Sequence, residues 1–134
     1  MDSSALVEDG PKGIERVVSL LEQRGIRVLG AYLIGTTSAD EESEEVKLRI
    51  VTEDDGQRVR LAYAGLRRDG LLPAMSEDVA VTPVRSEDNE ASGVLDYARQ
   101  IGHPPVRIRG VVWKGLFIED ALVVRYPEHA TATA

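Results

Sequence analysis

The chain has 134 residues, a formal net charge of −7 and no cysteine. This length fits one compact domain or two small units packed together. The lack of cysteine excludes disulfides, thiolate nucleophiles and cysteine-ligated metal sites, and the negative charge disfavours a nucleic-acid partner unless the basic residues cluster.

No apolar stretch approaches the ~20 residues that a membrane-spanning helix needs. The N-terminal sequence MDSSALVEDG has no basic segment followed by a long apolar run, so it does not resemble a signal peptide. We therefore expect a cytoplasmic protein that does not associate with membranes.

The first part of the chain is predicted to form a strand, a turn and a helix. Residues 3–7 read as a short strand, and residues 8–12 read as a turn because Gly10 and Pro11 interrupt regular structure. Apolar residues then recur at i, i+3, i+4 and i+7, on one face of a helix: Ile14, Val17, Val18 and Leu21. Gly25 is a natural end for that helix.

Two strands are expected next. Residues 26–36 are apolar on both faces, which is typical of a strand buried on both sides. Residues 45–52 alternate apolar and charged side chains, so one face of this strand is expected to contact solvent. The acidic run between them, at residues 38–45, reads as a solvated hairpin tip, because it lacks the spaced ligands and central glycine of a calcium loop.

Residues 56–70 fit two patterns. Val59, Leu61 and Tyr63 alternate as in a strand, but a helical stripe through Val59, Tyr63 and Leu66 fits equally well. We favour a helix, which Asp54 or Asp55 can cap and Gly70 can end.

The second half is predicted to add one strand, one helix and a strand pair. These elements cover residues 79–84, 93–101, 106–113 and 116–125, and residues 128–134 are expected to be a disordered tail. Pro83 indicates that the strand 79–84 lies at a sheet edge. In the loop before the helix, Glu87, Asp88 and Asn89 are expected to cap the helix.

The predicted order is therefore β-α-β-β-α-β-α-β-β, an α+β protein. Its first six elements follow the ferredoxin-like βαββαβ pattern, in which helices cover one face of an antiparallel sheet. The arrangement then restarts near Val79, where a strand, an acidic loop, a helix and a strand pair follow one another again.

The sequence resembles an ACT-type regulatory domain. The resemblance lies in DGPKG at residues 9–13, the helix and turn that follow it, the strand VKLRIVTED and the segment QRVRLAYAGLRRDGLL. It implies a first ACT-like unit at residues 1–76 and a second, truncated βαββ unit at 77–127 that shares its sheet or core. It also implies a regulatory protein without catalytic activity. We expect a homodimer, because a ferredoxin-like sheet leaves one face free of helices and the doubly apolar strand 26–36 needs cover there. The protein would then act through a protein partner.

The candidate ligand site is the segment that opens the first predicted helix, comprising Asp9, Gly10, Pro11, Gly13 and Ile14. Free backbone N–H groups at a helix start favour a carboxylate, and Asp9 offers a partner for an ammonium group. This combination suits an amino acid or a similar small metabolite. The alternative interpretation is a plain turn in which Asp9 or Gly10 caps the helix.

Two other function classes remain open. Lys12 separates Pro11 from Gly13, where ACT domains have an adjacent Pro-Gly; this favours an adaptor protein that keeps the fold without a ligand. The third class is a small cofactor-independent enzyme of the dimeric α/β-barrel type, which would use His103 with Tyr97 or Glu90.

The remaining motifs point to no cofactor. Neither a G-x-G-x-x-G nor a G-K-[ST] motif occurs, and His103 and His129 lie in unrelated contexts, which disfavours a metal site. Trp113 has two interpretations of equal weight: it belongs to an interface with another chain, or it folds over the sheet edge within its own chain.

Overall fold

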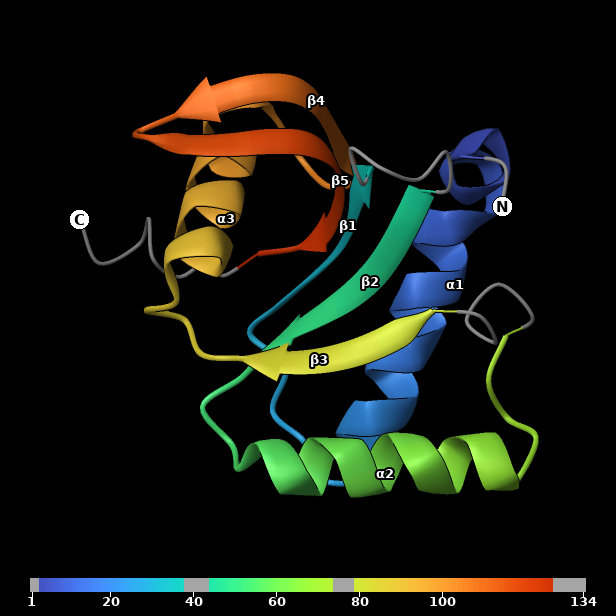
Figure 1. The fold of residues 1–134 in the computed structure, drawn as a ribbon. Coiled ribbons are helices and arrows are strands. Elements are labelled where there is room, and N and C mark those ends of the chain that lie inside the picture. Colours follow the sequence, from blue (N-terminus) through green and yellow to red (C-terminus); the bar gives the residue numbers. More distant parts are fainter. Residues whose placement is uncertain (1–2, 38–43, 74–78, 127–134) are drawn as a thin grey trace.

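The computed structural model of the chain describes residues 3–37, 44–73 and 79–126. The elements formed by these residues are shown in Figure 1: α1 (Ser3–Gln23), β1 (Gly30–Thr37), β2 (Glu44–Val51), α2 (Gly56–Arg68), β3 (Ala80–Val84), α3 (Asn89–Ile101), β4 (Val106–Trp113) and β5 (Leu116–Arg125). The predicted α+β class is confirmed. Within these ranges, no helix has the length and apolar character needed to cross a membrane.

The five strands form one mixed sheet in the order β3-β2-β1-β5-β4. β2 and β3 run parallel, joined through α2, and the other neighbouring strands are antiparallel. β3 is an edge strand, as Pro83 predicts, because a proline is tolerated where only one side of a strand is paired. Strands from both predicted units, 1–76 and 77–127, therefore belong to the same sheet.

β1 lies at the centre of the sheet and is buried on both faces, as its apolar pattern predicts. Ala31 and Leu33 face a core formed with α1 and α2. Tyr32 and Ile34 face a second core formed with α3. Helices thus cover both faces of the sheet (Figure 1), and α3 covers the face that a ferredoxin-like arrangement would leave open. A homodimer is not needed to bury β1.

Helix α2 resolves the ambiguous segment in favour of a helix. Asp55 caps it, and its carboxylate accepts a hydrogen bond of 3.0 Å from the backbone N–H of Gln57. Val59, Tyr63 and Leu66 are buried along one face, as the helical stripe predicts.

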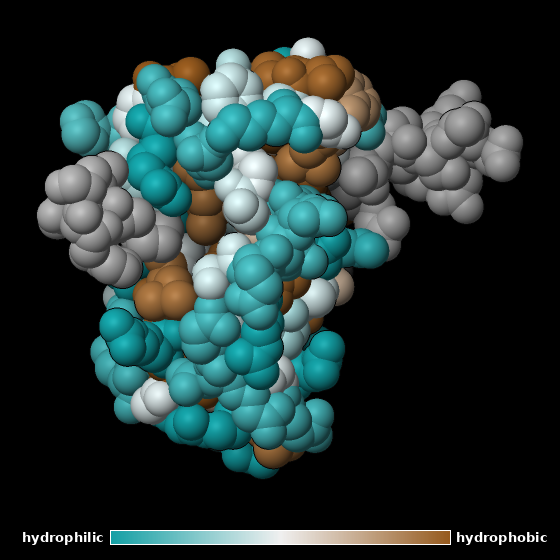
Figure 2. Space-filling view, turned by 90° about the vertical axis from the view of Figure 1, so that its left-hand side faces the viewer, coloured by the Kyte–Doolittle hydropathy of each residue, from teal (hydrophilic) through white to brown (hydrophobic). Residues whose placement is uncertain are grey.

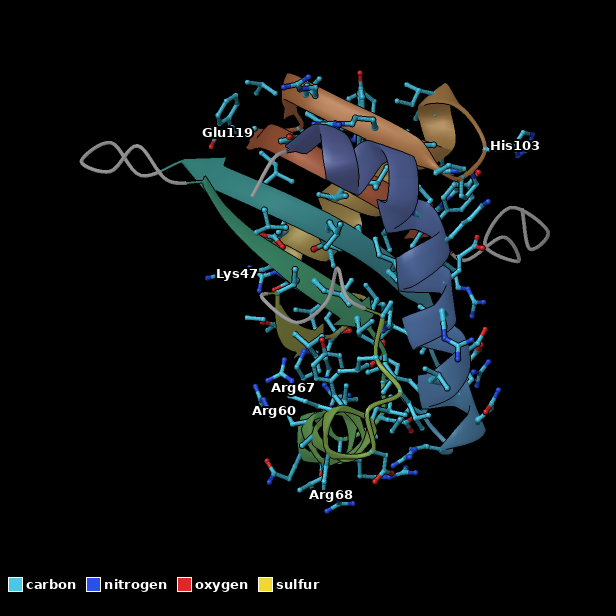
Figure 3. All side chains as sticks on the ribbon, turned by 90° about the vertical axis from the view of Figure 1, so that its right-hand side faces the viewer. Lys47, Arg60, Arg67, Arg68, His103 and Glu119 are labelled. Atoms are coloured by element: carbon cyan, nitrogen blue, oxygen red, sulfur yellow. The ribbon has the colours of Figure 1, made fainter. Side chains whose placement is uncertain are left out.

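The predicted strand at residues 3–7 and the turn at 8–12 are wrong. Helix α1 runs from Ser3 to Gln23 and contains Pro11 in its interior. A proline inside a helix removes one backbone hydrogen bond and bends the axis, and Figure 3 shows a bend toward the N-terminal end of α1. The first strand of the βαββαβ order is therefore replaced by helix.

The side chains of β4 do not alternate between its two faces throughout the strand. Strict alternation would place Val112 on the same buried face as Val106 and Ile108, but Val112 is 68% exposed. Gly110 has a φ of 61°, which interrupts the extended backbone and exchanges the faces of the residues beyond it. As a result, Val111 packs against the α3 core instead.

Candidate functional site

A pocket of about 730 Å³ lies between α3 and the turn of the β4–β5 hairpin. Asp88 caps α3, because its carboxylate accepts a hydrogen bond of 3.1 Å from the backbone N–H of Ala91. The hairpin turns at Lys114 and Gly115, both with positive φ, as in the tight turns that match strand twist. We call this hollow the α3–hairpin pocket.

Polar residues dominate the lining of the α3–hairpin pocket. It is lined by Ser86, Asn89, Ser92, Asp96, Arg99 and Lys114, together with Trp113 and four apolar or glycine residues. Figure 2 views the molecule from the side on which α3 and the hairpin end lie: polar atoms cover most of this face, and apolar atoms gather at the top, where Figure 1 places β4 and β5. The pocket has the size of a small-molecule site.

Asp96 connects α3 to the hairpin turn. Its Oδ2 accepts a hydrogen bond of 3.0 Å from the indole Nε1–H of Trp113 and another of 3.0 Å from the Nζ of Lys114. These bonds, the one from Lys114 first, hold the pKa of Asp96 below its ordinary range. Asp96 is therefore ionised at neutral pH.

The other carboxylate oxygen of Asp96 keeps its acceptor capacity. Both bonds end on Oδ2, and no hydrogen bond within the described residues ends on Oδ1. An ionised carboxylate offers about two acceptor positions on each oxygen. Oδ1 can thus accept a hydrogen bond from a cationic group of a ligand.

Arg99 supplies a positive charge to the lining of the same pocket. Its Nε is buried and has no hydrogen-bond partner within the described residues. Its guanidinium lies 6.0 Å from the ring centroid of Tyr126, which orients it. The positive charge of the guanidinium can attract an anionic group of a ligand in the pocket.

Trp113 packs within its own chain. Besides its bond to Asp96, its ring meets that of Tyr97 edge-to-face at a centroid distance of 5.1 Å, and the Nζ of Lys114 lies 5.4 Å from its ring centroid. Within its own chain, Trp113 therefore packs against α3; its role in an interface with another chain stays a prediction.

The residues predicted to bind a ligand lie elsewhere. Asp9, Gly10, Pro11, Gly13 and Ile14 are all within α1, which covers the face of the sheet opposite to α3. They do not form the start of a helix, so the free N–H groups expected of a helix start are not theirs. The side chain of Ile14 is fully buried in the core.

Two of the groups proposed for the enzyme class, Glu90 and His103, lie far apart. Glu90 lies in the first turn of α3 and His103 follows the end of that helix, so the length of the helix, about 20 Å, separates them. His103 is exposed and points outward in Figure 3. No group of three potential metal-ligating side chains gathers among the described residues.

Glu90 instead belongs to a polar network between α3 and the sheet. The hydroxyl of the fully buried Tyr32 donates a hydrogen bond of 2.7 Å to Glu90 Oε1, and Arg49 Nε donates one of 2.9 Å to the same oxygen. This network ties α3 to β1 and β2. It satisfies groups that would otherwise be buried without partners, so its role is structural.

Sequence reasoning missed Asp96 and Arg99. They stand three residues apart on the polar side of α3, a spacing that brings side chains together on a helix but that is common in solvated helices. The hairpin turn was predicted, but its contact with α3 depends on the fold, because 17 residues separate Trp113 from Asp96.

Comparison with known proteins identifies no similar protein. No model of a known protein family matches the chain, and neither does any curated protein or solved structure.

Proposed function

We propose that this protein is a non-catalytic regulatory module that binds a small zwitterionic metabolite, such as an α-amino acid, in the α3–hairpin pocket. The observation that carries the proposal is the opposed charge of two lining groups: an ionised Asp96 with a free oxygen, and the cationic side chain of Arg99. An ammonium group suits the first and a carboxylate suits the second.

The proposed ligand, an amino acid or a similar small metabolite, is of the class that the sequence suggests. The proposed site is the α3–hairpin pocket and not the segment around Asp9. The ligand would bridge α3 and the hairpin rather than contact α1. A regulatory effect would follow if the ligand binds one packing of the hairpin against α3 better than another. The resemblance to ACT domains supports a regulatory role, and we propose it only at the level of function, since α1 replaces the first strand of that arrangement.

A thermal-shift screen tests the proposal. The panel holds free α-amino acids, each compared with the corresponding amine without a carboxylate and the corresponding acid without an ammonium group. An amino acid at about a hundred times its Kd should add ~2.7 kcal/mol, which raises Tm by roughly 10 °C for a chain of this size. The amine and the acid should each shift Tm much less.

Variants locate the site. We expect Asp96→Asn and Arg99→Gln to abolish most of the shift, whereas the matched control Arg109→Gln, an exposed β4 residue outside the pocket lining, should retain it. If no zwitterion raises Tm, the adaptor alternative is favoured; if a shift survives in both pocket variants, the ligand binds elsewhere.

A further inference from the structure

Helix α2 concentrates positive charge in an acidic protein. Its sequence, GQRVRLAYAGLRR, holds four arginines and no acidic residue, although the whole chain carries a net charge of −7. Figure 3 looks along the axis of α2: Arg60 and Arg67 leave the helix on the side of β3, and Arg68 leaves it in another direction.

A groove lies between these arginines and the edge strand. It has a volume of about 420 Å³, and its lining includes Arg60, Arg67, Arg68, Tyr63 and Val81. We call it the arginine groove. The base of the groove is partly apolar, because the side chains of Tyr63 and Val81 contribute to it. Tyr63 is 6% exposed and Val81 is half-buried.

Two of the groove arginines have no acidic partner. Arg58, on another side of α2, donates to the backbone oxygen of Gly25 and pairs with Asp54. In contrast, the side chains of Arg60 and Arg67 form no ion pair or hydrogen bond within the described part of the chain. The guanidinium of Arg67 lies 5.4 Å from the ring centroid of Tyr63, a cation–π contact that holds it over the groove.

The groove runs beside backbone groups that can pair with another strand. β3 is bonded to β2 on one side and lies at the edge of the sheet on the other. An exposed sheet edge is a template for an added strand. The part of β3 that lines the groove is Ala80 and Val81. Pro83, further along, has no N–H to donate, so pairing is confined to the N-terminal part of β3. Strand addition requires a partner with backbone N–H and C=O groups, which a polynucleotide does not have, so the sheet edge and the arginines together favour an acidic peptide over a polynucleotide.

We propose that the edge of β3 and the arginine groove together dock an extended acidic segment of a partner protein. The backbone of the segment pairs with β3, and its carboxylates meet Arg60 and Arg67. This inference is independent of the α3–hairpin pocket and gives the module a surface through which to act on a partner.

The test measures binding of a fluorescein-labelled peptide of alternating glutamate and valine by fluorescence anisotropy at low salt. We expect saturable binding that weakens with added salt. The double variant Arg60→Gln/Arg67→Gln should weaken it about tenfold, which corresponds to about 1.4 kcal/mol. Both side chains are exposed, so the variant is expected to fold; circular dichroism checks this.

Three matched comparisons decide the outcome. Arg16→Gln/Arg109→Gln removes the same charge from two exposed residues outside the groove and should change affinity less than about twofold. The same glutamate–valine peptide with every backbone nitrogen methylated carries the same charge but has no N–H to donate to β3, and it should bind about tenfold more weakly. A labelled single-stranded oligonucleotide of equal charge should bind more weakly than the glutamate–valine peptide.

The proposal is overturned by any of four results. These are no saturable binding of the glutamate–valine peptide, equal losses of affinity in the two double variants, equal affinity for the N-methylated peptide, or tighter binding of the oligonucleotide. The last result would assign the groove to nucleic acid.

Discussion

Tyr32 is a single residue that connects the sheet to α3. Its side chain is fully buried, and its hydroxyl donates to Glu90 Oε1, the oxygen that also accepts from Arg49. Burial, and then the hydrogen bond to the Glu90 carboxylate, raise the pKa of Tyr32 far above its ordinary range. The native protein therefore retains this proton in alkaline solution.

Stability should fall with alkaline pH because of Tyr32. Above pH ~10 the unfolded chain loses the tyrosine proton while the native state keeps it, so the native state binds more protons and the free energy of unfolding falls by up to ~1.4 kcal/mol per pH unit. Tyr32→Phe should cost about 1.5–3 kcal/mol at neutral pH and should lack this component of the pH dependence.

Urea unfolding of both proteins between pH 7 and 11 measures this difference. The gap in stability between the wild type and Tyr32→Phe should be constant up to pH ~10 and then narrow. A gap that stays constant to pH 11 would show that Tyr32 ionises in the native state as readily as in the unfolded chain.

Single residues with local roles were predictable, but the pocket was not. Asp55 and Asp88 were expected to cap helices, and both do, because a cap depends on residues within one turn. Asp96 and Arg99 gain their significance from the hairpin that folds onto them. No local pattern distinguishes them from other charged residues on the polar side of a helix.

At the scale of elements, close contact between α3 and the sheet depends on a small residue. A Cβ on Gly30, the first residue of β1, would lie 2.9 Å from Leu95 Cδ1 and 3.2 Å from the backbone oxygen of Arg125. Leu95 is only 4% exposed, and the backbone of β5 is fixed by its pairing with β1. Neither neighbour can move away freely.

We expect Gly30→Ala to destabilise the fold by about 1–3 kcal/mol, the usual cost of overpacking. The matched control is Gly102→Ala, at the end of α3, where an added Cβ meets nothing within 4 Å and the backbone is extended. This control should be neutral or slightly stabilising, because it reduces the entropy of the unfolded chain.

Urea denaturation midpoints provide the measurement, and an unchanged slope shows that the unfolded states are comparable. Equal stability of the two variants would mean that α3 is not held as tightly against β1 as its packing indicates.

Most elements were predictable because their apolar periodicity agrees with their burial. The stripe of Ile14, Val17, Val18 and Leu21 is 0–1% exposed, and β1 is buried on both faces. The exception is the chain before Ile14, where Gly10, Pro11 and Gly13 favour a turn but lie in α1. Local propensity is a weak predictor there, since one continuous helix can outweigh it.

At the scale of the whole molecule, the two proposed sites lie on different parts of the sheet. The α3–hairpin pocket is formed on the face covered by α3, and the arginine groove lies at the β3 edge beside α2. β3 leads directly into Ser86, which lines the pocket and whose hydroxyl donates to Glu53, in the turn before α2. This chain segment connects the two sites.

The order of the strands in the sheet could not be predicted from the sequence. Element type follows from local periodicity, whereas the arrangement β3-β2-β1-β5-β4 depends on which surfaces pack best over the whole chain. A ferredoxin-like pattern placed all helices on one face, but α3 covers the other face, because the apolar side chains of β1 and β5 that point there must also be buried.

The most direct test of the central claim uses Trp113, the one tryptophan in the sequence. Its indole N–H donates to Asp96 at the pocket, so it gives a single NMR signal that reports on this site. Free α-amino acids are titrated into 15N-labelled protein. We expect at least one of them to shift the indole signal saturably, and the shift to be lost in Asp96→Asn. An indole signal that none of them moves, or a shift that persists unchanged in Asp96→Asn, would contradict ligand binding in the α3–hairpin pocket.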